Sequence, residues 1–405
     1  MRFLFSMNNT PVQVFLTSGL AVNLLTGDSV TLSEEECSRY RNDVMFRSEV
    51  NSALATPVPT GSQDPDYLTF TIETTRVCNL ACTYCYQNDR KTKERISYDL
   101  IDKIVDYILW ACRDSGKRYA EIRLIGGEPL IARPETEYLV EALESADDCT
   151  FSYYADTNGC LPLSWLFEAA ERVSVCVCLT LPRDHNKERY SSGHDTTERI
   201  IRNISRVSPN ATQEVALCYN AHHNNLGDFE DYLEWIAPLQ NNPVGQVFAS
   251  NLDNYTFNEL RFFNSLTSAE FDYWYGNVAV PLLLKYGWPV TFQEALPSCL
   301  CQGHQPYSCK FYASGEVTIC DAMQIHESRC DVSKLASDPG MLNRVYADIK
   351  THDPWVSTGC SSCFARPVCG GRKWCEIGEC RPSACSRHMA ANLKVMEFHF
   401  GSDAS

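Results

Sequence analysis

Residues 75–86 read Thr75-Arg76-Val77-Cys78-Asn79-Leu80-Ala81-Cys82-Thr83-Tyr84-Cys85-Tyr86, which places three cysteines in a Cys-x3-Cys-x2-Cys spacing. An iron–sulfur cluster is normally held by four thiolates. Three thiolates can bind three irons of a four-iron cluster, and the fourth iron is then open to a ligand that is not protein. Such a cluster is suited to chemistry at one iron. A zinc site fits the run less well, because structural zinc favours Cys-x2-Cys pairs and four protein ligands.

The run resembles the signature of radical S-adenosylmethionine (SAM) enzymes, including the aromatic Tyr84 before the third cysteine. The resemblance implies that Cys78, Cys82 and Cys85 hold a catalytic [4Fe–4S] cluster and that SAM chelates its open iron. One electron from the cluster then releases a 5′-deoxyadenosyl radical from SAM. In such enzymes the cofactor supplies the chemistry, while the protein orients and shields it.

The composition points to a cytoplasmic, metal-binding protein. The chain has 21 cysteines among 405 residues, and so many cysteines without a secretory signal indicate metal ligands rather than disulfides. The start, Met1 to Thr10, has no sustained apolar stretch, and no run of about 18 apolar residues is present for a membrane span. A formal net charge of −16 disfavours nucleic acid as a partner.

Residues 1–64 are predicted to form a small N-terminal α/β module. Two apolar runs, Val12 to Phe15 and Ala21 to Leu25, are typical of strands, and Ser33 precedes three glutamates in the pattern of a capped helix start. Residues 57–62 have the composition of a linker. An exposed strand edge in this module would suit the leader of a precursor peptide.

Residues 65–297 alternate between strand and helix patterns. Ser97 is expected to cap a helix whose apolar residues recur every three or four positions. The predicted strands are Tyr67 to Glu73, Glu121 to Ile125, Thr150 to Tyr154, Val173 to Leu179, Glu214 to Tyr219 and Val244 to Phe248. Repeated β–α units predict a parallel sheet with its site at the carboxyl ends of the strands. The resemblance narrows this α/β fold to a partial, TIM-like (β/α)6 barrel.

Two further segments match SAM-binding elements of the same family. Gly126-Gly127-Glu128-Pro129 follows the second predicted strand and resembles the family's Gly-Gly-Glu-Pro motif, which binds the methionine amino group of SAM. Thr157-Asn158-Gly159 follows the third strand and resembles an element near the SAM ribose and carboxylate, although an Asn-Gly pair is also an ordinary turn. The predicted cofactor-binding residues are Tyr84, Gly126, Gly127, Glu128 and Asn158. After the fourth strand, the family's Asp-Gly pair is missing.

Residues 298–405 are rich in cysteine and have short strand patterns, including a hairpin around Ser314-Gly315. A region with so little core would draw folding free energy from metal binding. Its cysteine spacing resembles the SPASM extension of radical SAM enzymes that modify peptides, except that five residues rather than three separate Cys369 from Cys375.

The SPASM resemblance implies two auxiliary [4Fe–4S] clusters. The predicted ligands of the first are Cys301, Cys309, Cys320 and Cys375, and those of the second are Cys360, Cys363, Cys369 and Cys385. Cys299, Cys330 and Cys380 are alternative ligands. Zinc stays an alternative for this region because Cys360-x2-Cys363 has zinc-ribbon spacing.

These resemblances imply a radical SAM oxidoreductase that matures a ribosomally made precursor peptide. The radical would abstract hydrogen from the peptide, and a C–C (cyclophane) or thioether cross-link would follow. Its partners would be a peptide with a leader and a one-electron reductant such as flavodoxin or ferredoxin. One alternative is a sulfatase-maturase-like enzyme that generates formylglycine. An alternative of another class is an iron–sulfur electron carrier or structural protein, which the three-cysteine loop disfavours because carriers have fully ligated clusters.

Overall fold

The computed structural model covers the 405-residue chain. It describes residues 12–15, 20–23, 29–54, 66–85, 87, 92–190, 196–240, 243–251, 265–290, 302–320 and 325–350. Within these ranges no helix is both long enough and apolar enough to cross a lipid bilayer.

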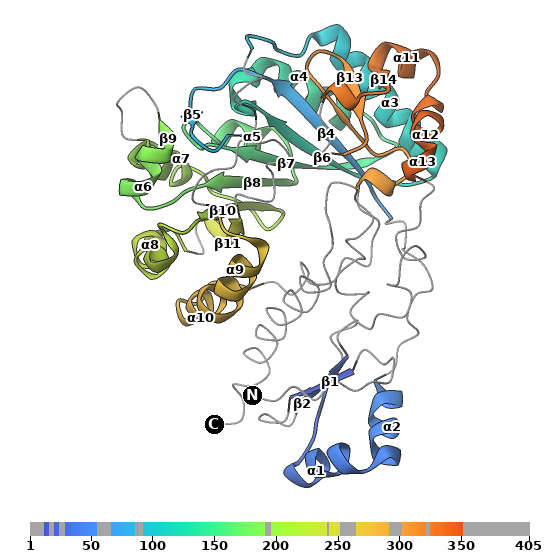
Figure 1. The fold of residues 1–405 in the computed structure, drawn as a ribbon. Coiled ribbons are helices and arrows are strands. Elements are labelled where there is room, and N and C mark those ends of the chain that lie inside the picture. Colours follow the sequence, from blue (N-terminus) through green and yellow to red (C-terminus); the bar gives the residue numbers. More distant parts are fainter. Residues whose placement is uncertain are drawn as a thin grey trace.

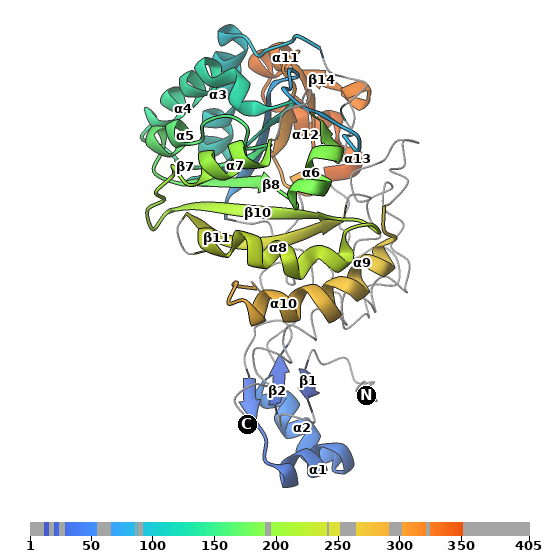
Figure 2. The same cartoon turned by 90° about the vertical axis from the view of Figure 1, so that its left-hand side faces the viewer.

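The N-terminal residues form a small sheet followed by two helices. The strands pair antiparallel in the order β1-β2-β3, and they are β1 (Val12–Phe15), β2 (Leu20–Asn23) and β3 (Ser29–Thr31). The helices are α1 (Glu34–Asn42) and α2 (Val44–Ala53). Ser33 caps α1 as predicted, and Glu36 completes a capping box by accepting the Ser33 N–H at 2.8 Å. Figures 1 and 2 show this module set apart from the large sheet.

A large sheet forms the main body. All six strands predicted for the barrel are present, and they pair in parallel in the order in which they occur along the chain. They are β4 (Leu68–Thr75), β6 (Tyr119–Gly126), β7 (Thr150–Thr157), β8 (Val173–Cys178), β10 (Gln213–Ala221) and β11 (Val244–Asn251). This arrangement confirms the predicted partial barrel.

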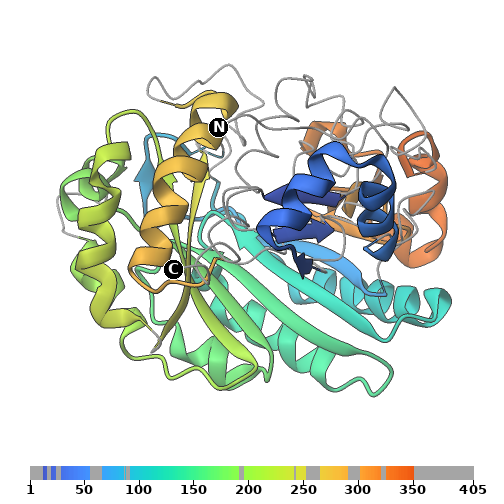
Figure 3. The same cartoon turned by 90° about the horizontal axis from the view of Figure 1, so that it is seen from below.

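Helices connect the strands and line one face of the sheet (Figures 2 and 3). Ser97 caps the longest of them, as predicted, by accepting the Leu100 N–H at 3.2 Å. The helices are α3 (Tyr98–Ser115), α4 (Arg133–Glu144), α5 (Ser164–Ala169), α6 (Pro182–Glu188), α7 (Thr197–Ile204), α8 (Phe229–Ile236), α9 (Ser268–Trp274) and α10 (Val280–Lys285). A π-helical turn, η6 (Tyr275–Ala279), joins α9 to α10.

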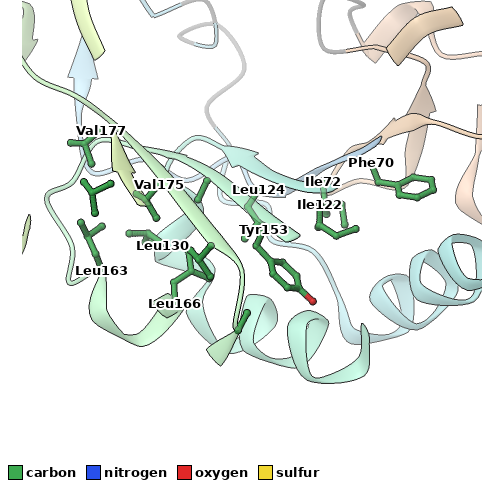
Figure 4. Packing of buried hydrophobic residues seen from close by; sticks show 14 of the residues in the cluster. Phe70, Ile72, Ile122, Leu124, Leu130, Tyr153, Leu163, Leu166, Val175 and Val177 are labelled. Carbon is green, nitrogen blue, oxygen red and sulfur yellow. The ribbon is translucent and has the colours of Figure 1, made fainter. Parts of the chain in front are cut away.

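The apolar core lies between the sheet and these helices. Figure 4 shows Val175 and Val177 of β8 near Leu163 and Leu166, and all four side chains are buried. Because side chains alternate along a strand, the residues between these valines and after them point to the opposite, concave face. Cys176 and Cys178 are therefore on the inner face of the barrel.

The sheet continues past β4 into residues 302–350. The predicted Ser314-Gly315 hairpin is present as β12 (Cys309–Phe311) and β13 (Glu316–Thr318), followed by β14 (Cys330–Asp331) and helices α11 (Val332–Ser337), α12 (Met341–Val345) and α13 (Ala347–Lys350). β12 pairs in parallel with β4, and Phe311 stacks on Phe70 with ring centroids 6.4 Å apart. These residues thus share the barrel's sheet and core. Residues 351–405 lie outside the described residues, and the domain boundary at 297/298 stays a prediction.

Candidate cluster and cofactor site

The cysteine loop leaves the carboxyl end of β4, as the sequence predicted for a barrel active site. Within the loop, β5 (Ala81–Cys82) pairs antiparallel with β9 (Arg189–Tyr190), a two-residue strand that follows α6. The Leu80 N–H donates to Cys78 Sγ at 3.4 Å. Cys82 is buried, whereas Cys78 and Cys85 are partly exposed. The loop is therefore held at its middle by a strand from the other side of the barrel.

Gly126 and Gly127 lie against the first residues of the cysteine loop. The Gly127 N–H donates to the Thr75 carbonyl and the Glu128 N–H donates to the Val77 carbonyl, both at 2.8 Å. A Cβ atom on Gly126 would be 2.3 Å from the Thr75 oxygen, and one on Gly127 would be 2.4 Å from the Val77 oxygen. Only glycine permits this approach. The two predicted SAM-binding elements are thus fastened to each other by backbone contacts.

Glu128 joins the ends of β6 and β7. Its carboxylate accepts hydrogen bonds from Thr157 Oγ1 at 2.6 Å, Asn158 N at 2.8 Å and Leu130 N at 3.2 Å. Burial raises the pKa of Glu128, and these three hydrogen bonds oppose the shift. A carboxylate has roughly four acceptor sites, so three are used by the protein and the carboxylate retains capacity for one further donor.

Asn158 connects the third strand to the cysteine loop. Its Nδ2 donates to Asn79 Oδ1 at 2.6 Å and lies 4.0 Å from Cys78 Sγ, while its Oδ1 accepts the Cys160 N–H at 2.9 Å. Both ends of the Asn158 amide are engaged by the turn or the loop. The Thr157-Asn158-Gly159 segment is therefore hydrogen-bonded to the cysteine loop. An ordinary Asn-Gly turn would not need such a contact.

Arg189 lies beside the cysteine loop, although the predicted set of site residues did not include it. It pairs with Cys82 across β5 and β9, it is 7% exposed, and its Nη1 donates to the Cys178 carbonyl at 2.8 Å. Its Nε has no hydrogen-bond partner among the residues that the structure describes. A buried guanidinium requires a compensating anion or hydrogen-bond acceptors. Arg189 follows the fourth predicted strand, where the family's Asp-Gly pair is missing, so the sequence offered no basis for assigning it.

Tyr84 points toward the inner face of the barrel. Its hydroxyl accepts from Asn220 Nδ2 of β10 at 3.1 Å, and burial raises its pKa, so the phenol stays protonated. Three thiols share this inner face, Cys176 and Cys178 of β8 and Cys218 of β10, and the register pairs Cys178 with Cys218. Cys176 and Cys218 are buried, and Cys178 is partly exposed.

The C-terminal ligand sets are only partly within the described residues. Cys309 is fully buried on β12, where burial raises its pKa, and Cys320 follows β13 and is partly exposed. Cys330, an alternative ligand, is buried on β14. Across the described ranges, no three His, Cys, Asp or Glu side chains converge on a single-metal site. Predicted ligands outside these ranges are Cys301, Cys360, Cys363, Cys369, Cys375 and Cys385, with alternatives Cys299 and Cys380.

Comparison with known proteins agrees with this geometry. Residues 72–236 match the model of the Radical SAM superfamily. The chain therefore carries a radical SAM domain, a family that implies a [4Fe–4S] cluster and SAM.

Two curated proteins are similar to part of this chain. The radical SAM cyclopropyl synthase TigE of Paramaledivibacter caminithermalis is 24% identical over 150 residues, which cover 33% of this chain and 31% of TigE. The uncharacterized protein MJ0907 of Methanocaldococcus jannaschii is 25% identical over 111 residues, which cover 27% of this chain and 37% of that protein. The chain thus spans about a third of the length of these relatives.

Solved structures share the fold at low sequence identity. Native anSMEcpe with bound AdoMet and Cp18Cys peptide aligns over 84% of this chain and 99% of its own, with a TM-score of 0.61 and 16% identity. Streptococcus suis SuiB bound to precursor peptide SuiA aligns over 91% of this chain and 94% of its own, with a TM-score of 0.51 and 13% identity. These matches support the partial barrel.

The residues at the carboxyl edge fit the family's two groups. One loop carries all three thiols, and beside the second of them lies a buried guanidinium whose Nε has no hydrogen-bond partner among the described residues. Thiolates bound to iron carry negative charge, as does the carboxylate of SAM. The Arg189 guanidinium can therefore donate through its Nε to an anionic group bound at this edge.

Proposed function

We propose that the protein is a radical SAM enzyme that modifies a ribosomally made precursor peptide. Cys78, Cys82 and Cys85 would hold the cluster, and Tyr84, Gly126, Gly127, Glu128 and Asn158 would form the SAM site. The observation that carries this proposal is the hydrogen-bonded assembly that joins all three sequence elements, through Thr75, Val77, Asn79 and Glu128. Such an assembly positions a cofactor over one defined spot at the strand ends.

The chain contributes position and environment to the reaction. When bound, the cluster and SAM would supply one-electron cleavage to a 5′-deoxyadenosyl radical, which abstracts hydrogen from the peptide. Glu128 is placed to accept one more N–H, and Arg189 is placed to balance negative charge beside Cys82. Asn220 fixes Tyr84 against the inner face of the barrel. A reactive carbon radical needs a fixed geometry, which the hydrogen-bonded ends of the strands would provide.

The product would be an oxidative cross-link, either a cyclophane-type C–C bond or a thioether. The fold is shared with proteins whose structures were solved with peptides, anSMEcpe with Cp18Cys and SuiB with SuiA. Two auxiliary [4Fe–4S] clusters in the C-terminal region would accept the electron that such an oxidation releases. Cys309 and Cys320 flank the β12–β13 hairpin and would belong to the first of them.

The N-terminal module would bind the leader of the precursor. Its three-stranded sheet has two edge strands, β1 and β3, and an extended peptide adds to such an edge through main-chain hydrogen bonds. Leader affinity of the full chain is compared with that of a chain beginning at Asp64. The proposal requires the shorter chain to lose affinity, and unchanged affinity would exclude it.

SAM cleavage tests the enzyme class before any substrate is known. The anaerobically purified, cluster-loaded protein is incubated with SAM and dithionite, and 5′-deoxyadenosine is quantified. A radical SAM enzyme makes it, whereas an iron–sulfur carrier makes none. Changing Cys78, Cys82 and Cys85 to Ala should abolish 5′-deoxyadenosine and leave the iron of the C-terminal region in place.

The peptide is then identified from the short reading frame beside the gene and co-expressed with the enzyme, inside a cell that supplies flavodoxin or ferredoxin. Mass spectrometry of the product decides the reaction type. A loss of two mass units per event supports cross-linking. An unchanged mass with altered stereochemistry would instead indicate epimerisation and contradict the oxidative assignment.

A further inference from the structure

Two buried thiols approach each other far from the candidate site. The Sγ atoms of Cys112 and Cys149 are 3.0 Å apart, against about 2.05 Å in a disulfide bond. Cys112 is in the last turn of α3 and is 2% exposed, and Cys149 immediately precedes β7 and is 8% exposed. Formation of a bond would therefore require a movement of about one ångström between side chains that already face each other.

The pair is located at the amino-terminal edge of the parallel sheet. Cys149 adjoins Thr150, whose N–H donates to the Arg118 carbonyl at 2.8 Å, at the point where β6 and β7 begin. The cysteine loop and Gly126-Gly127 are at the opposite, carboxyl edge. These two thiols are thus separated from the candidate cluster by the length of the strands, and they have no part in the assembly described above.

The two sulfurs are not equivalent. The Cys112 S–H donates to Cys149 Sγ, and this hydrogen bond lowers the pKa of Cys149 while it raises the pKa of Cys112. Asp148 disfavours ionisation of both thiols, and Arg113 favours that of Cys112. Cys149 is accordingly the sulfur that ionises first and reacts as the nucleophile.

Simple core packing does not account for this contact. Buried cysteines usually behave as small apolar groups, and Cys37 is an example, because its Sγ lies at 3.9 Å from the Leu32 carbonyl. A sulfur–sulfur approach of 3.0 Å is shorter than such contacts and is directed from one thiol to the other. Intracellular disulfides, where they occur, are usually transient and redox-sensing.

We propose that Cys112 and Cys149 form an oxidisable dithiol that closes reversibly to a disulfide, with a peroxide as the oxidant. The Cys149 thiolate attacks a peroxide oxygen and becomes a sulfenic acid, with release of hydroxide, which takes up a proton. The Cys112 sulfur then attacks the sulfenic sulfur, and a second water leaves. In sum, two thiols and hydrogen peroxide give one disulfide and two waters.

Closing the disulfide ties α3 to β7. The two cysteines are 37 positions apart, and the segment between them carries β6, Gly126-Gly127-Glu128 and α4. A bond that closes such a loop restricts the unfolded chain and thereby stabilises the folded one. Under peroxide stress, the oxidised protein should therefore resist unfolding of the segment between Cys112 and Cys149, which carries the proposed SAM-binding residues.

Differential alkylation with peptide mapping tests the pair directly. The full-length protein is treated anaerobically with hydrogen peroxide, remaining thiols are alkylated, and proteolytic peptides are mapped. We expect a cross-linked peptide pair containing Cys112 and Cys149, two mass units below the reduced sum, which dithiothreitol reverses. The thermal unfolding midpoint should rise on oxidation. Recovery of both cysteines as alkylated thiols, or their pairing with other cysteines, would overturn the proposal.

Variants add a second readout. Cys112→Ala and Cys149→Ala should each remove the cross-link and the oxidant-dependent shift in midpoint, while Cys37→Ala, a buried cysteine of the N-terminal module, should retain both. If either variant fails to fold, the peptide map of the unaltered protein still shows whether Cys112 and Cys149 form a disulfide. A shift in midpoint that persists in Cys149→Ala would contradict the assignment.

Discussion

At the scale of single residues, Gly126 and Gly127 show how the predicted SAM site and the cysteine loop depend on each other. The sequence predicted these glycines as a cradle for a ligand. The structure adds that they also make room for the loop backbone, because a Cβ at either position would meet a carbonyl oxygen within 2.4 Å. The need for glycine at these two positions thus arises from the protein backbone itself, before any cofactor binds.

Gly127→Ala should displace the loop that carries Cys78. Crowding of this kind typically costs about 1–3 kcal/mol in the free energy of unfolding, and the loaded variant should retain less iron and bind SAM more weakly. Gly227→Ala is the matched control, since no described atom lies within 4 Å of the position that a Cβ would take there. Urea unfolding and iron analysis measure the two effects. Equal stability and equal iron content of the two variants would show that the close approach at Gly127 does not position the cysteine loop.

Glu128 predicts a pH dependence of stability. Burial raises its pKa above the ordinary 4.5, so its contribution to the free energy of unfolding is fully present below pH 4.5 and is lost as pH rises through the raised pKa. Relative to Glu128→Gln, the wild-type protein should therefore lose stability as pH increases from 4.5, by about 1.4 kcal/mol per unit of pKa difference. Urea unfolding of the metal-free proteins measures this. Parallel pH profiles would contradict the assignment.

Arg189 predicts that the affinity of the cluster-loaded protein for SAM depends on one buried positive charge. Arg189→Met keeps much of the side-chain volume but removes the buried charge beside Cys82 and the hydrogen bond to Cys178. Charge-assisted hydrogen bonds contribute about 1.5–3 kcal/mol, so SAM affinity should fall roughly tenfold to a hundredfold. Arg183→Met is the control, because Arg183 is 58% exposed on α6. Isothermal titration of the loaded proteins compares them, and equal affinities would remove Arg189 from the site.

At the scale of secondary structure, short sequence patterns predicted the helix caps and the barrel strands, because local contacts determine these features. Ser33 and Ser97 cap their helices, and all six barrel strands lie where apolar runs placed them. Two pairings were not predictable in this way. β12 joins β4 across more than two hundred residues, and β5 pairs with the two-residue β9. Neither pairing can be recognised from a short stretch of sequence. Arg189 lies on β9, so the sequence did not indicate that it lies beside Cys82.

Phe311 tests whether β12 is part of the barrel core. Its side chain is fully buried, with ring centroids 6.4 Å from Phe70 of β4 and 5.8 Å from Tyr107 of α3. Phe311→Ala should cost about 3–5 kcal/mol in the free energy of unfolding. Tyr273→Ala, at a residue 71% exposed on α9, should cost little. If denaturant unfolding shows the barrel unaffected by Phe311→Ala, the C-terminal segment is an independent unit.

At the scale of the whole molecule, the sequence predicted the class of fold, because repeated β–α units can be recognised in one chain, and its cysteine spacing gave the candidate site as a prediction. The sequence did not predict which hydrogen bonds connect the cysteine loop to the ends of β6 and β7. Contact of Glu128 with SAM stays a prediction, and the structure shows that Glu128 accepts hydrogen bonds from Thr157 and Asn158. The peptide and the bond formed depend on a second molecule, so neither can be derived from this chain.

The central claim is that Cys78, Cys82 and Cys85 hold a cluster with one iron open to SAM. Electron paramagnetic resonance of the dithionite-reduced protein, recorded with and without SAM, tests it most directly. The account predicts a cluster signal whose g-values shift when SAM is added, and the loss of that SAM-responsive signal when the three cysteines are changed to Ala. A reduced cluster signal that SAM leaves unchanged in the wild-type protein would contradict it.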